Sequence, residues 1–151
     1  MKRILVTGAN GQLGTTLKQQ SLGSEDQWVF CGREAIDITD SHSITSFLEK
    51  QNFDFCINCA AYTHVEGAET EIDAARALNV EAVKNLVAAC NEKQITLLHI
   101  STDYVFDGIK KTPYVETDPT APLNQYGKSK LQGEQYIQQN AAAFYIIRTS
   151  W

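Results

Sequence analysis

The sequence predicts an α/β fold with a doubly wound parallel sheet and helices on both faces. Short apolar segments rich in β-branched residues alternate with longer segments whose apolar residues recur at helical spacing. A glycine-rich turn, Gly8-x-x-Gly11-x-x-Gly14, directly follows the first apolar segment. Alternating strands and helices give a parallel sheet, and right-handed crossovers between the strands then give the Rossmann order. We therefore expect a Rossmann-like domain.

The composition limits the number of domains and the kinds of partner. The chain has 151 residues, of which 43% are hydrophobic and 21% charged, enough for one well-buried domain over residues 1–151. Its net charge of -5 and its 13 scattered lysines and arginines argue against nucleic-acid binding. No apolar run has the length that spans a membrane, and no charged-then-apolar leader opens the chain. We expect a cytoplasmic protein that does not associate with membranes.

The first strand and the turn after it predict a phosphate-binding site. Residues 3–7, Arg-Ile-Leu-Val-Thr, have the apolar character of a parallel strand buried on both faces. Gly8 can adopt backbone angles closed to other residues, Gly11 lets the backbone approach a pyrophosphate, and Gly14 lets the next helix pack on the strand. The N-terminus of that helix would face the phosphates, although an ordinary glycine-rich turn is the alternative. The cofactor contacts expected in this loop are Gly8, Asn10, Gly11, Gln12, Leu13 and Gly14.

The residues after the second strand bear on the choice of cofactor. The first helix should extend from Leu13 to about Leu22, and the next strand should cover residues 28–31. An acid just beyond this strand would bind a ribose 2′-hydroxyl, whereas a base suits a 2′-phosphate. Arg33 stands there and favours NADPH over NADH, with an exposed arginine in a turn as the alternative.

The middle of the chain predicts two more helices around a strand. A helix capped by Asp40 or Ser41 should bury Ile44, Phe47 and Leu48. A strand over residues 54–59 follows, and a long helix over about residues 72–90 comes after a polar loop. Small residues at the end of that strand would let a cofactor lie against the backbone, and the contacts expected here are Ala60, Ala61 and Tyr62.

The cysteines and histidines predict no metal site. Cys56 and Cys59 form a Cys-x-x-Cys pattern without a second pair, and residues three apart on a strand point to opposite faces. We interpret both thiols as structural instead of metal-binding or redox-active. His42, His64 and His99 lack the spacing of metal ligands and are interpreted as surface or packing residues.

The second half of the chain predicts the chemistry. A strand over residues 95–100 ends close to the Thr102 hydroxyl, and a turn-rich loop over residues 110–123 follows. Asn124 should cap a helix on which Tyr126 and Lys130, four residues apart, share one face. Pro122 stands where a P-loop would have its first glycine, which excludes that motif; a surface helix with an incidental tyrosine and lysine is the other alternative. A last strand is expected over residues 144–149.

Together these side chains suit the reduction of a ketone. Hydride transfer to a carbonyl needs a proton donor beside its oxygen, and a free tyrosine with a pKa of about 10 is mismatched to neutral pH by about 4 kcal/mol. We expect the charge of Lys130 to lower the pKa of Tyr126, and at about 5 Å it would contribute about 3 kcal/mol toward this. Thr102 would hold the substrate oxygen close to Tyr126.

The chain resembles the extended short-chain dehydrogenases/reductases, and within them the dTDP-4-dehydrorhamnose reductase family. The Ser-Thr-Asp-Tyr-Val-Phe run from Ser101 and the closing Arg-Thr-Ser-Trp are the most specific matches. Glu66 and Cys59 depart mildly from the family, which more often has Asp and Ala there. The resemblance covers residues 7–14, 37–39, 58–63, 101–108, 122–124, 126–127, 129–131, 133–134 and 148–151.

The resemblance implies an activity and a role for particular residues. It implies NAD(P)H-dependent reduction of the 4-keto group of dTDP-4-dehydro-L-rhamnose to dTDP-L-rhamnose, a step of cell-surface polysaccharide biosynthesis. Asp37 and Ile38 would contact the adenine, and Asn79 would help to hold the catalytic lysine through water. The implied catalytic residues are Thr102, Tyr126 and Lys130, of which the last two also contact the cofactor. The implied substrate contacts are Thr63, Val65, Thr102, Asp103 and Trp151.

Family members are substantially longer than this chain. By the resemblance, residues 1–151 form the NAD(P)-binding domain and end after the sixth strand, before the C-terminal region that forms most of the sugar-nucleotide pocket. We therefore expect the chain alone to bind cofactor weakly and to show little or no turnover. The magnesium and homodimer contacts of the full-length family member depend partly on that C-terminal region, so we do not transfer them to this chain. The alternatives are a non-catalytic NADP-binding regulatory subunit, and a reductase or epimerase that acts on another nucleotide sugar.

Overall fold

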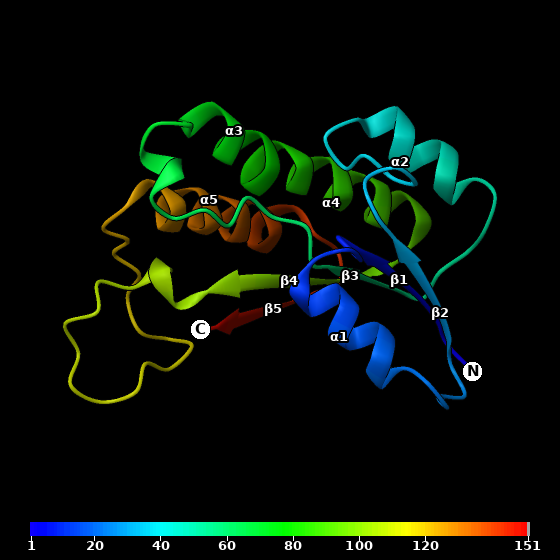
Figure 1. Ribbon diagram of the computed structural model, residues 1–151, viewed down its shortest axis with the longest axis horizontal. Coiled ribbons are helices and arrows are strands. Elements are labelled where there is room, and N and C mark those ends of the chain that lie inside the picture. Colours follow the sequence, from blue (N-terminus) through cyan, green and yellow to red (C-terminus); the bar gives the residue numbers. More distant parts are fainter. Residues whose placement is uncertain (151) are drawn as a thin grey trace.

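The computed structural model describes residues 1–150 as a five-stranded parallel sheet packed against helices (Figure 1). The strands lie in the order β2-β1-β3-β4-β5, so the chain begins inside the sheet and extends it first on one side and then on the other. The predicted doubly wound α/β fold is confirmed. The strands are β1 (Arg3–Thr7), β2 (Gln27–Cys31), β3 (Phe55–Asn58), β4 (Thr96–Thr102) and β5 (Phe144–Thr149).

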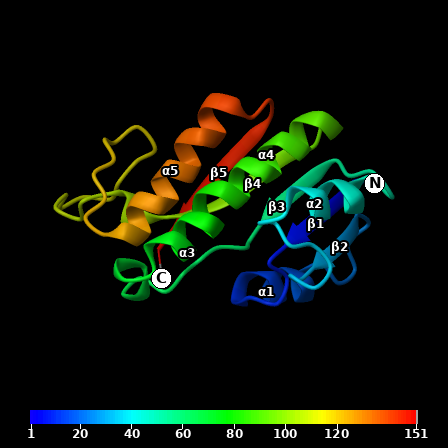
Figure 2. The same cartoon turned by 90° about the horizontal axis from the view of Figure 1, so that it is seen from above.

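The helices cover the two faces of the sheet unequally. Helices α2, α3, α4 and α5 lie on one face, while α1 lies on the other (Figure 1), and α4 and α5 run side by side (Figure 2). No helix in residues 1–150 is long and apolar enough to cross a membrane. The helices are α1 (Gln12–Gln20), α2 (Ser41–Leu48), α3 (Ile72–Arg76), α4 (Ala82–Lys93) and α5 (Gln125–Asn140), with short helical turns η1 (Gly67–Glu69), η2 (Ala77–Glu81) and η3 (Asp103–Val105).

The main core lies between the sheet and the larger helical layer. Leu5 of β1, Leu97 of β4, Leu86 of α4 and Ile137 of α5 are almost completely buried in it. Alternate residues of a strand point to opposite faces, so each strand contributes every second side chain to this core. The sheet and the helices are thereby fixed against each other, and the loops at the carboxyl ends of the strands are held on a rigid base.

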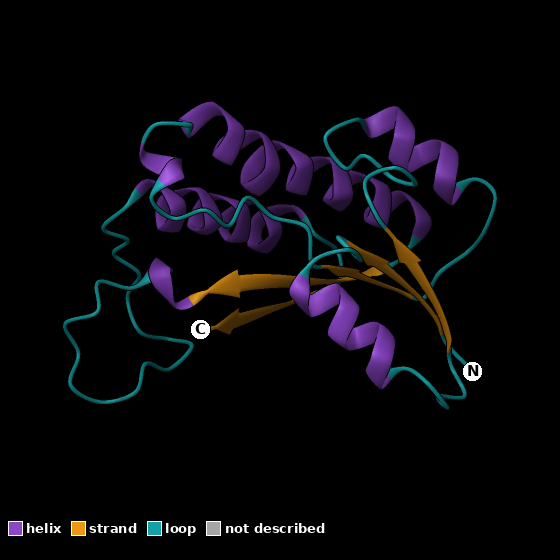
Figure 3. Ribbon diagram, viewed as in Figure 1, coloured by secondary structure: helices purple, strands orange, loops and turns teal. Residues whose placement is uncertain are grey.

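Local sequence signals determine where several elements begin and end. The Asp40 side chain accepts a hydrogen bond from the His42 N–H (2.9 Å) and caps α2, and Asn124 caps α5 by accepting one from the Gly127 N–H (2.7 Å). The first and last strands have the predicted bounds. A long loop joins η3 to α5 where the turn-rich segment was expected (Figure 3).

The strand over residues 144–149, which we counted as the sixth, is the fifth and last strand in residues 1–150. The segment between β2 and α2 forms turns: the N–H groups of Ala35 and Ile36 both donate to the Gly32 carbonyl at 3.1 Å, and the Asp40 N–H donates to the Asp37 carbonyl at 3.1 Å. Backbone groups that are satisfied within the segment cannot pair with a neighbouring strand. This segment therefore adds no strand, and the sheet in the described residues has five strands, where our count had been six.

The long helix predicted over residues 72–90 is interrupted. Helix α3 continues through the π-helical turn η2 into α4, which extends to Lys93 and ends at Gln94 in the left-handed region (φ 57°). A π turn inserts one extra residue into a helix and reorients the side chains around it. Here it carries Asn79, which is fully buried between α5 and the segment after β3.

Candidate functional site

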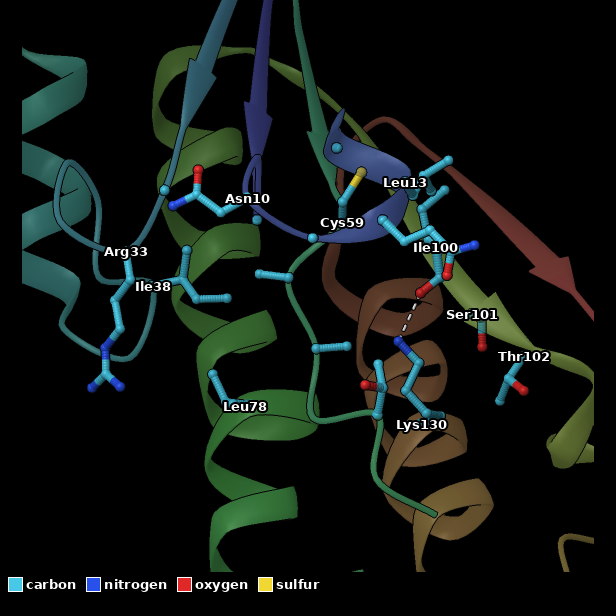
Figure 4. A pocket seen from close by; sticks show the side chains of 18 of the residues that line it. Asn10, Leu13, Arg33, Ile38, Cys59, Leu78, Ile100, Ser101, Thr102 and Lys130 are labelled. Carbon is cyan, nitrogen blue, oxygen red and sulfur yellow. Dashed lines mark hydrogen bonds between the residues drawn. The ribbon is translucent and has the colours of Figure 1, made fainter. Parts of the chain in front are cut away.

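A pocket of about 720 Å³ opens at the carboxyl ends of the strands, where parallel sheets of this type hold their ligands (Figure 4). Its wall includes the glycine turn, the segment after β2 and the end of β4. Residues from distant parts of the sequence therefore meet in one cavity. The lining residues that were predicted as site residues are Gly8, Asn10, Gly11, Gln12, Leu13, Gly14, Arg33, Asp37, Ile38, Ala60, Ala61, Thr63, Val65, Thr102, Tyr126 and Lys130.

The glycine turn has a conformation that needs glycine at two positions. Gly8 has φ +68°, and a Cβ there would lie 2.5 Å from the backbone nitrogen of Ala60. A Cβ on Gly14 would lie 2.6 Å from the Gly8 carbonyl oxygen, so only glycine lets α1 start this close to the turn. Gly11 is the N-cap of α1, and no side chain caps this end of the helix. The first N–H groups of α1 are therefore available to an anion.

One end of the pocket carries charged side chains from the segment after β2. The Arg33 guanidinium pairs with the Asp37 carboxylate at 3.1 Å. Hydrogen bonds from Thr39 are the main cause that lowers the pKa of Asp37, and Arg33 adds to them. Glu34 also lines the pocket and accepts a long hydrogen bond from the Asn10 side chain (3.4 Å). Glu34 was missed in the sequence, although it follows β2 closely enough to have been considered with Arg33.

The other end of the pocket carries the three predicted catalytic side chains. Thr102 is buried at the end of β4, and Tyr126 and Lys130 are buried on α5. A Cβ on Gly127 would clash with the Tyr104 carbonyl oxygen, so glycine lets α5 approach η3 closely. The Tyr104 ring then packs edge-on against Tyr126, with 5.7 Å between the ring centroids. A helix and a strand end are thus brought together around one small volume.

The protonation of Tyr126 differs from the expectation. Burial raises its pKa above the ordinary value and outweighs the neighbouring Thr102 hydroxyl, which lowers it. We expected the charge of Lys130 to lower this pKa, but in this structure Lys130 is not among the groups that shift it. The Lys130 Nζ instead donates to the Ile100 carbonyl oxygen at 2.7 Å (Figure 4). Tyr126 is therefore a protonated phenol at neutral pH.

Lys130 is almost completely buried, with 2% of its surface exposed. Burial lowers the pKa of Lys130 to about 8. The negative charge of Glu134, one turn further along α5, raises this pKa but does not offset the effect of burial. Its Nζ also lies 3.3 Å from Nε2 of His99, which is fully buried on β4. Burial likewise lowers the pKa of His99 well below its ordinary value, and the Lys130 charge adds to this. His99 is therefore a neutral imidazole beside the lysine.

Three predicted site residues do not line the pocket. Asn79 lies behind the wall, where its side chain accepts from the Tyr62 N–H (3.0 Å) and donates to the Tyr62 carbonyl (3.1 Å) and the Ser129 hydroxyl (2.9 Å). Asn79 thus fixes the segment after β3 against α5. Tyr62 and Asp103 adjoin lining residues without lining the pocket themselves. Trp151 lies outside the described residues.

The thiols have the properties of structural cysteines. Burial raises the pKa of Cys59 to about 11, and a hydrogen bond with Cys90 together with burial raises that of Cys56 well above its ordinary value. Neutral thiols are poor nucleophiles and poor metal ligands. Within residues 1–150, no cluster of three or more histidine, cysteine, aspartate or glutamate side chains is arranged to hold a metal ion.

Comparisons with known proteins agree on one family. Residues 1–151 match the family described as the RmlD substrate binding domain. A dTDP-4-dehydrorhamnose reductase of Burkholderia thailandensis is 44% identical over 149 residues, which cover 99% of this chain and 50% of that protein. A dTDP-4-keto-6-deoxy-D-glucose reductase of Streptomyces niveus is 39% identical over 150 residues, covering 99% and 52%.

A solved structure adds a cofactor to this comparison. The dTDP-4-dehydrorhamnose reductase of Bacillus anthracis in complex with NADP superposes with a TM-score of 0.95 at 37% identity, and the match covers 99% of this chain and 54% of that one. The chain therefore spans about half the length of the relatives it matches.

Proposed function

The chain belongs to the RmlD substrate binding domain family, and on this basis we propose that the protein reduces the 4-keto group of dTDP-4-dehydro-L-rhamnose with NADPH to give dTDP-L-rhamnose. The observation that carries the proposal is the pocket itself. It joins a glycine turn suited to a pyrophosphate to the side chains of Thr102, Tyr126 and Lys130. Two relatives named as reductases of dTDP-linked keto sugars support the substrate class.

Residues of the pocket fit a nicotinamide dinucleotide. The free N–H groups at the start of α1 would hold its pyrophosphate, and Asp37 and Ile38 would contact its adenine. Arg33 pairs with Asp37 through its Nε, but its side chain is 82% exposed, so its other guanidinium nitrogens would reach a 2′-phosphate, which supports NADPH over NADH. The relative crystallised with NADP supports the same choice. The bound cofactor would supply the hydride for the reduction.

The protein's own contribution is to orient the sugar and to supply a proton. Thr102 would hold the sugar's carbonyl oxygen against Tyr126, and Tyr126, which is protonated at neutral pH, would donate its proton to that oxygen. Phenolate is left behind in the buried pocket, where the positive charge of Lys130 would stabilise it. Thr63 and Val65, which also line the pocket, would contact the sugar. Asp103, next to Thr102, would do so from the start of η3.

The free thiols fit a reducing compartment. Cys31, Cys56, Cys59 and Cys90 form no disulfide with each other, although all four lie in or near the core. Cytosolic proteins keep their thiols reduced in this way, which supports a cytoplasmic site for the reaction.

Turnover of a defined keto sugar tests the proposal. The complete protein is incubated with dTDP-4-dehydro-L-rhamnose and either NADPH or NADH, and oxidation of the cofactor is followed by its absorbance. We expect turnover with both cofactors and a higher kcat/KM with NADPH. A matched panel with dTDP-4-keto-6-deoxy-D-glucose and a UDP-linked 4-keto sugar identifies the sugar, because a different preferred substrate would replace the one proposed. Tight NADPH binding without turnover of any keto sugar would instead indicate a regulatory subunit.

A further inference from the structure

A buried hydrogen-bond chain connects the backbone after β3 to Lys130. Asn58, at the end of β3, is 1% exposed, and His99 beside it on β4 is fully buried. The Asn58 Nδ2 lies 3.1 Å from the His99 Nδ1, and the His99 Nε2 lies 3.3 Å from the Lys130 Nζ. The chain of contacts thus crosses two strands and ends on a residue of the proposed active site. Neither Asn58 nor His99 lines the pocket.

One backbone N–H group determines the direction of this chain. The Asn58 Oδ1 accepts a hydrogen bond from the Ala60 N–H at 3.1 Å and another from the Thr7 hydroxyl at 2.7 Å. A backbone N–H can only donate, so the amide of Asn58 cannot be reversed without losing that bond. Its Nδ2 therefore donates toward His99, and the His99 Nδ1 must accept. Because the imidazole is neutral, its single proton then lies on Nε2.

The Nε2–H of His99 points at the amine of Lys130. A neutral amine has one lone pair that can accept this hydrogen bond, while one of its own protons goes to the Ile100 carbonyl oxygen at 2.7 Å. An ammonium group has no lone pair, so a charged Lys130 would place an N–H donor against the Nε2–H donor of His99. A hydrogen bond to the neutral form of a group disfavours its charged form. The chain from Ala60 through Asn58 and His99 therefore favours the uncharged state of Lys130.

Among the ionisable side chains around Lys130 in the described residues, His99 is the one with a hydrogen-bond contact to the Lys130 Nζ. On α5 itself, Tyr126 and Glu134 lie one turn before and one turn after it, and both are buried. Glu134 is engaged by Arg148 of β5, with 2.6 Å between the closest nitrogen and oxygen. From η3, the charge of Asp103 acts on Tyr126 and helps to raise its pKa. From β4, His99 faces the amine directly.

We propose that His99 is a positioning residue for Lys130. His99 presents its Nε2–H to the lysine amine and so sets the pH range over which the lysine carries its charge. The effect of His99 on the charge of Lys130 does not depend on the proposed function. Only the role of that charge in the reduction rests on it. Lys130 would be charged below its pKa and neutral above it, so the stabilisation of the Tyr126 phenolate would be lost as the pH rises through that pKa. His99 thereby defines the alkaline limit of the activity without touching the substrate.

Nuclear magnetic resonance of the complete protein, without substrate, tests the proposal at both ends of the contact. Histidine is labelled at both ring nitrogens and lysine at Cε, and the Lys130 resonance is followed as the pH is raised. We expect the Nε2–H tautomer for His99 and a Lys130 midpoint of about 8. His99→Leu removes the donor and should raise that midpoint by about one pH unit, the equivalent of one hydrogen bond. His99→Gln retains an N–H donor and should keep the midpoint close to the original one.

His42→Leu is the matched control, because His42 is an exposed histidine on α2 far from the contact, and it should leave the Lys130 midpoint unchanged. An Nδ1–H tautomer for His99, or equal midpoints for the wild type, His99→Leu and His99→Gln, would overturn the proposal. If the proposal holds, the alkaline limb of the kcat/KM profile should move to higher pH with His99→Leu and return with His99→Gln. The titrations remain interpretable if the protein reduces no keto sugar, so failure of the proposed function is distinguished from failure of this inference.

Discussion

Replacing Tyr126 with phenylalanine is expected to lower kcat for the keto sugar by about 10³-fold, the contribution typical of a positioned general acid. The substitution removes only the hydroxyl, and the ring would keep its edge-on contact with Tyr104. Because the glycine turn and Arg33 are untouched, NADPH should still bind, and its dissociation constant should rise far less than kcat falls, since only the contact of the Tyr126 hydroxyl with the cofactor is lost. Steady-state kinetics and a binding titration of the same preparation measure the two quantities separately.

Tyr145→Phe is the matched control for the loss of a hydroxyl. Tyr145 lies on β5, the residue is 63% exposed, and it does not line the pocket. We expect its kcat to equal that of the wild type. If Tyr126→Phe reduced the sugar as fast as Tyr145→Phe, the proton would come from another group, and the role proposed for Tyr126 would be wrong.

Replacing Arg148 with methionine is expected to lower the free energy of unfolding by about 3–5 kcal/mol, the usual cost of leaving one partner of a buried ion pair unpaired. Glu134 is fully buried on α5 and accepts hydrogen bonds from Arg148 through both carboxylate oxygens, at 2.6 to 3.2 Å. The Ser101 hydroxyl also donates to this carboxylate. The guanidinium therefore joins β5 to the helix that carries Tyr126 and Lys130. Urea unfolding followed by circular dichroism measures the change.

Two further variants separate this effect from the loss of any arginine. Arg76→Met removes an exposed guanidinium that lies 3.6 Å from Glu81, and it should cost less than about 1 kcal/mol. The double variant Glu134→Leu with Arg148→Met removes both charges and should recover most of the stability lost in Arg148→Met. A double variant no more stable than Arg148→Met would contradict the view that an unpaired buried carboxylate causes the loss.

The sequence predicted those parts of the fold that depend on neighbouring residues. Residues 3–7 and 144–149 form strands because their own side chains suit a buried sheet, and Asp40 and Asn124 start helices through bonds that span two or three residues. The same holds for the glycine turn, where the conformation of Gly8 follows from the residue itself. Tyr126 and Lys130 share a face because they lie four residues apart on one helix.

Contacts between distant segments could not be predicted in the same way. His99 was interpreted as a surface or packing residue, because nothing near it in the sequence shows that Asn58, 41 residues earlier, fixes its tautomer, or that Lys130 lies beside it. The pKa of Tyr126 is raised because the residue is buried. The expectation that it would be lowered considered only the charge of Lys130 and left burial out. The π turn at Asn79 likewise depends on packing against α5.

We place the nicotinamide cofactor and the keto sugar in one pocket, between the glycine turn and Tyr126, and the fate of a labelled hydride tests this most directly. The complete protein is supplied with NADPH that carries deuterium at both hydrogen positions of C4 of the nicotinamide, together with dTDP-4-dehydro-L-rhamnose, and the product is analysed by mass spectrometry and nuclear magnetic resonance. We expect dTDP-L-rhamnose with one deuterium at C4 of the sugar. Recovery of unreacted keto sugar, or of a product without deuterium at that carbon, would contradict it.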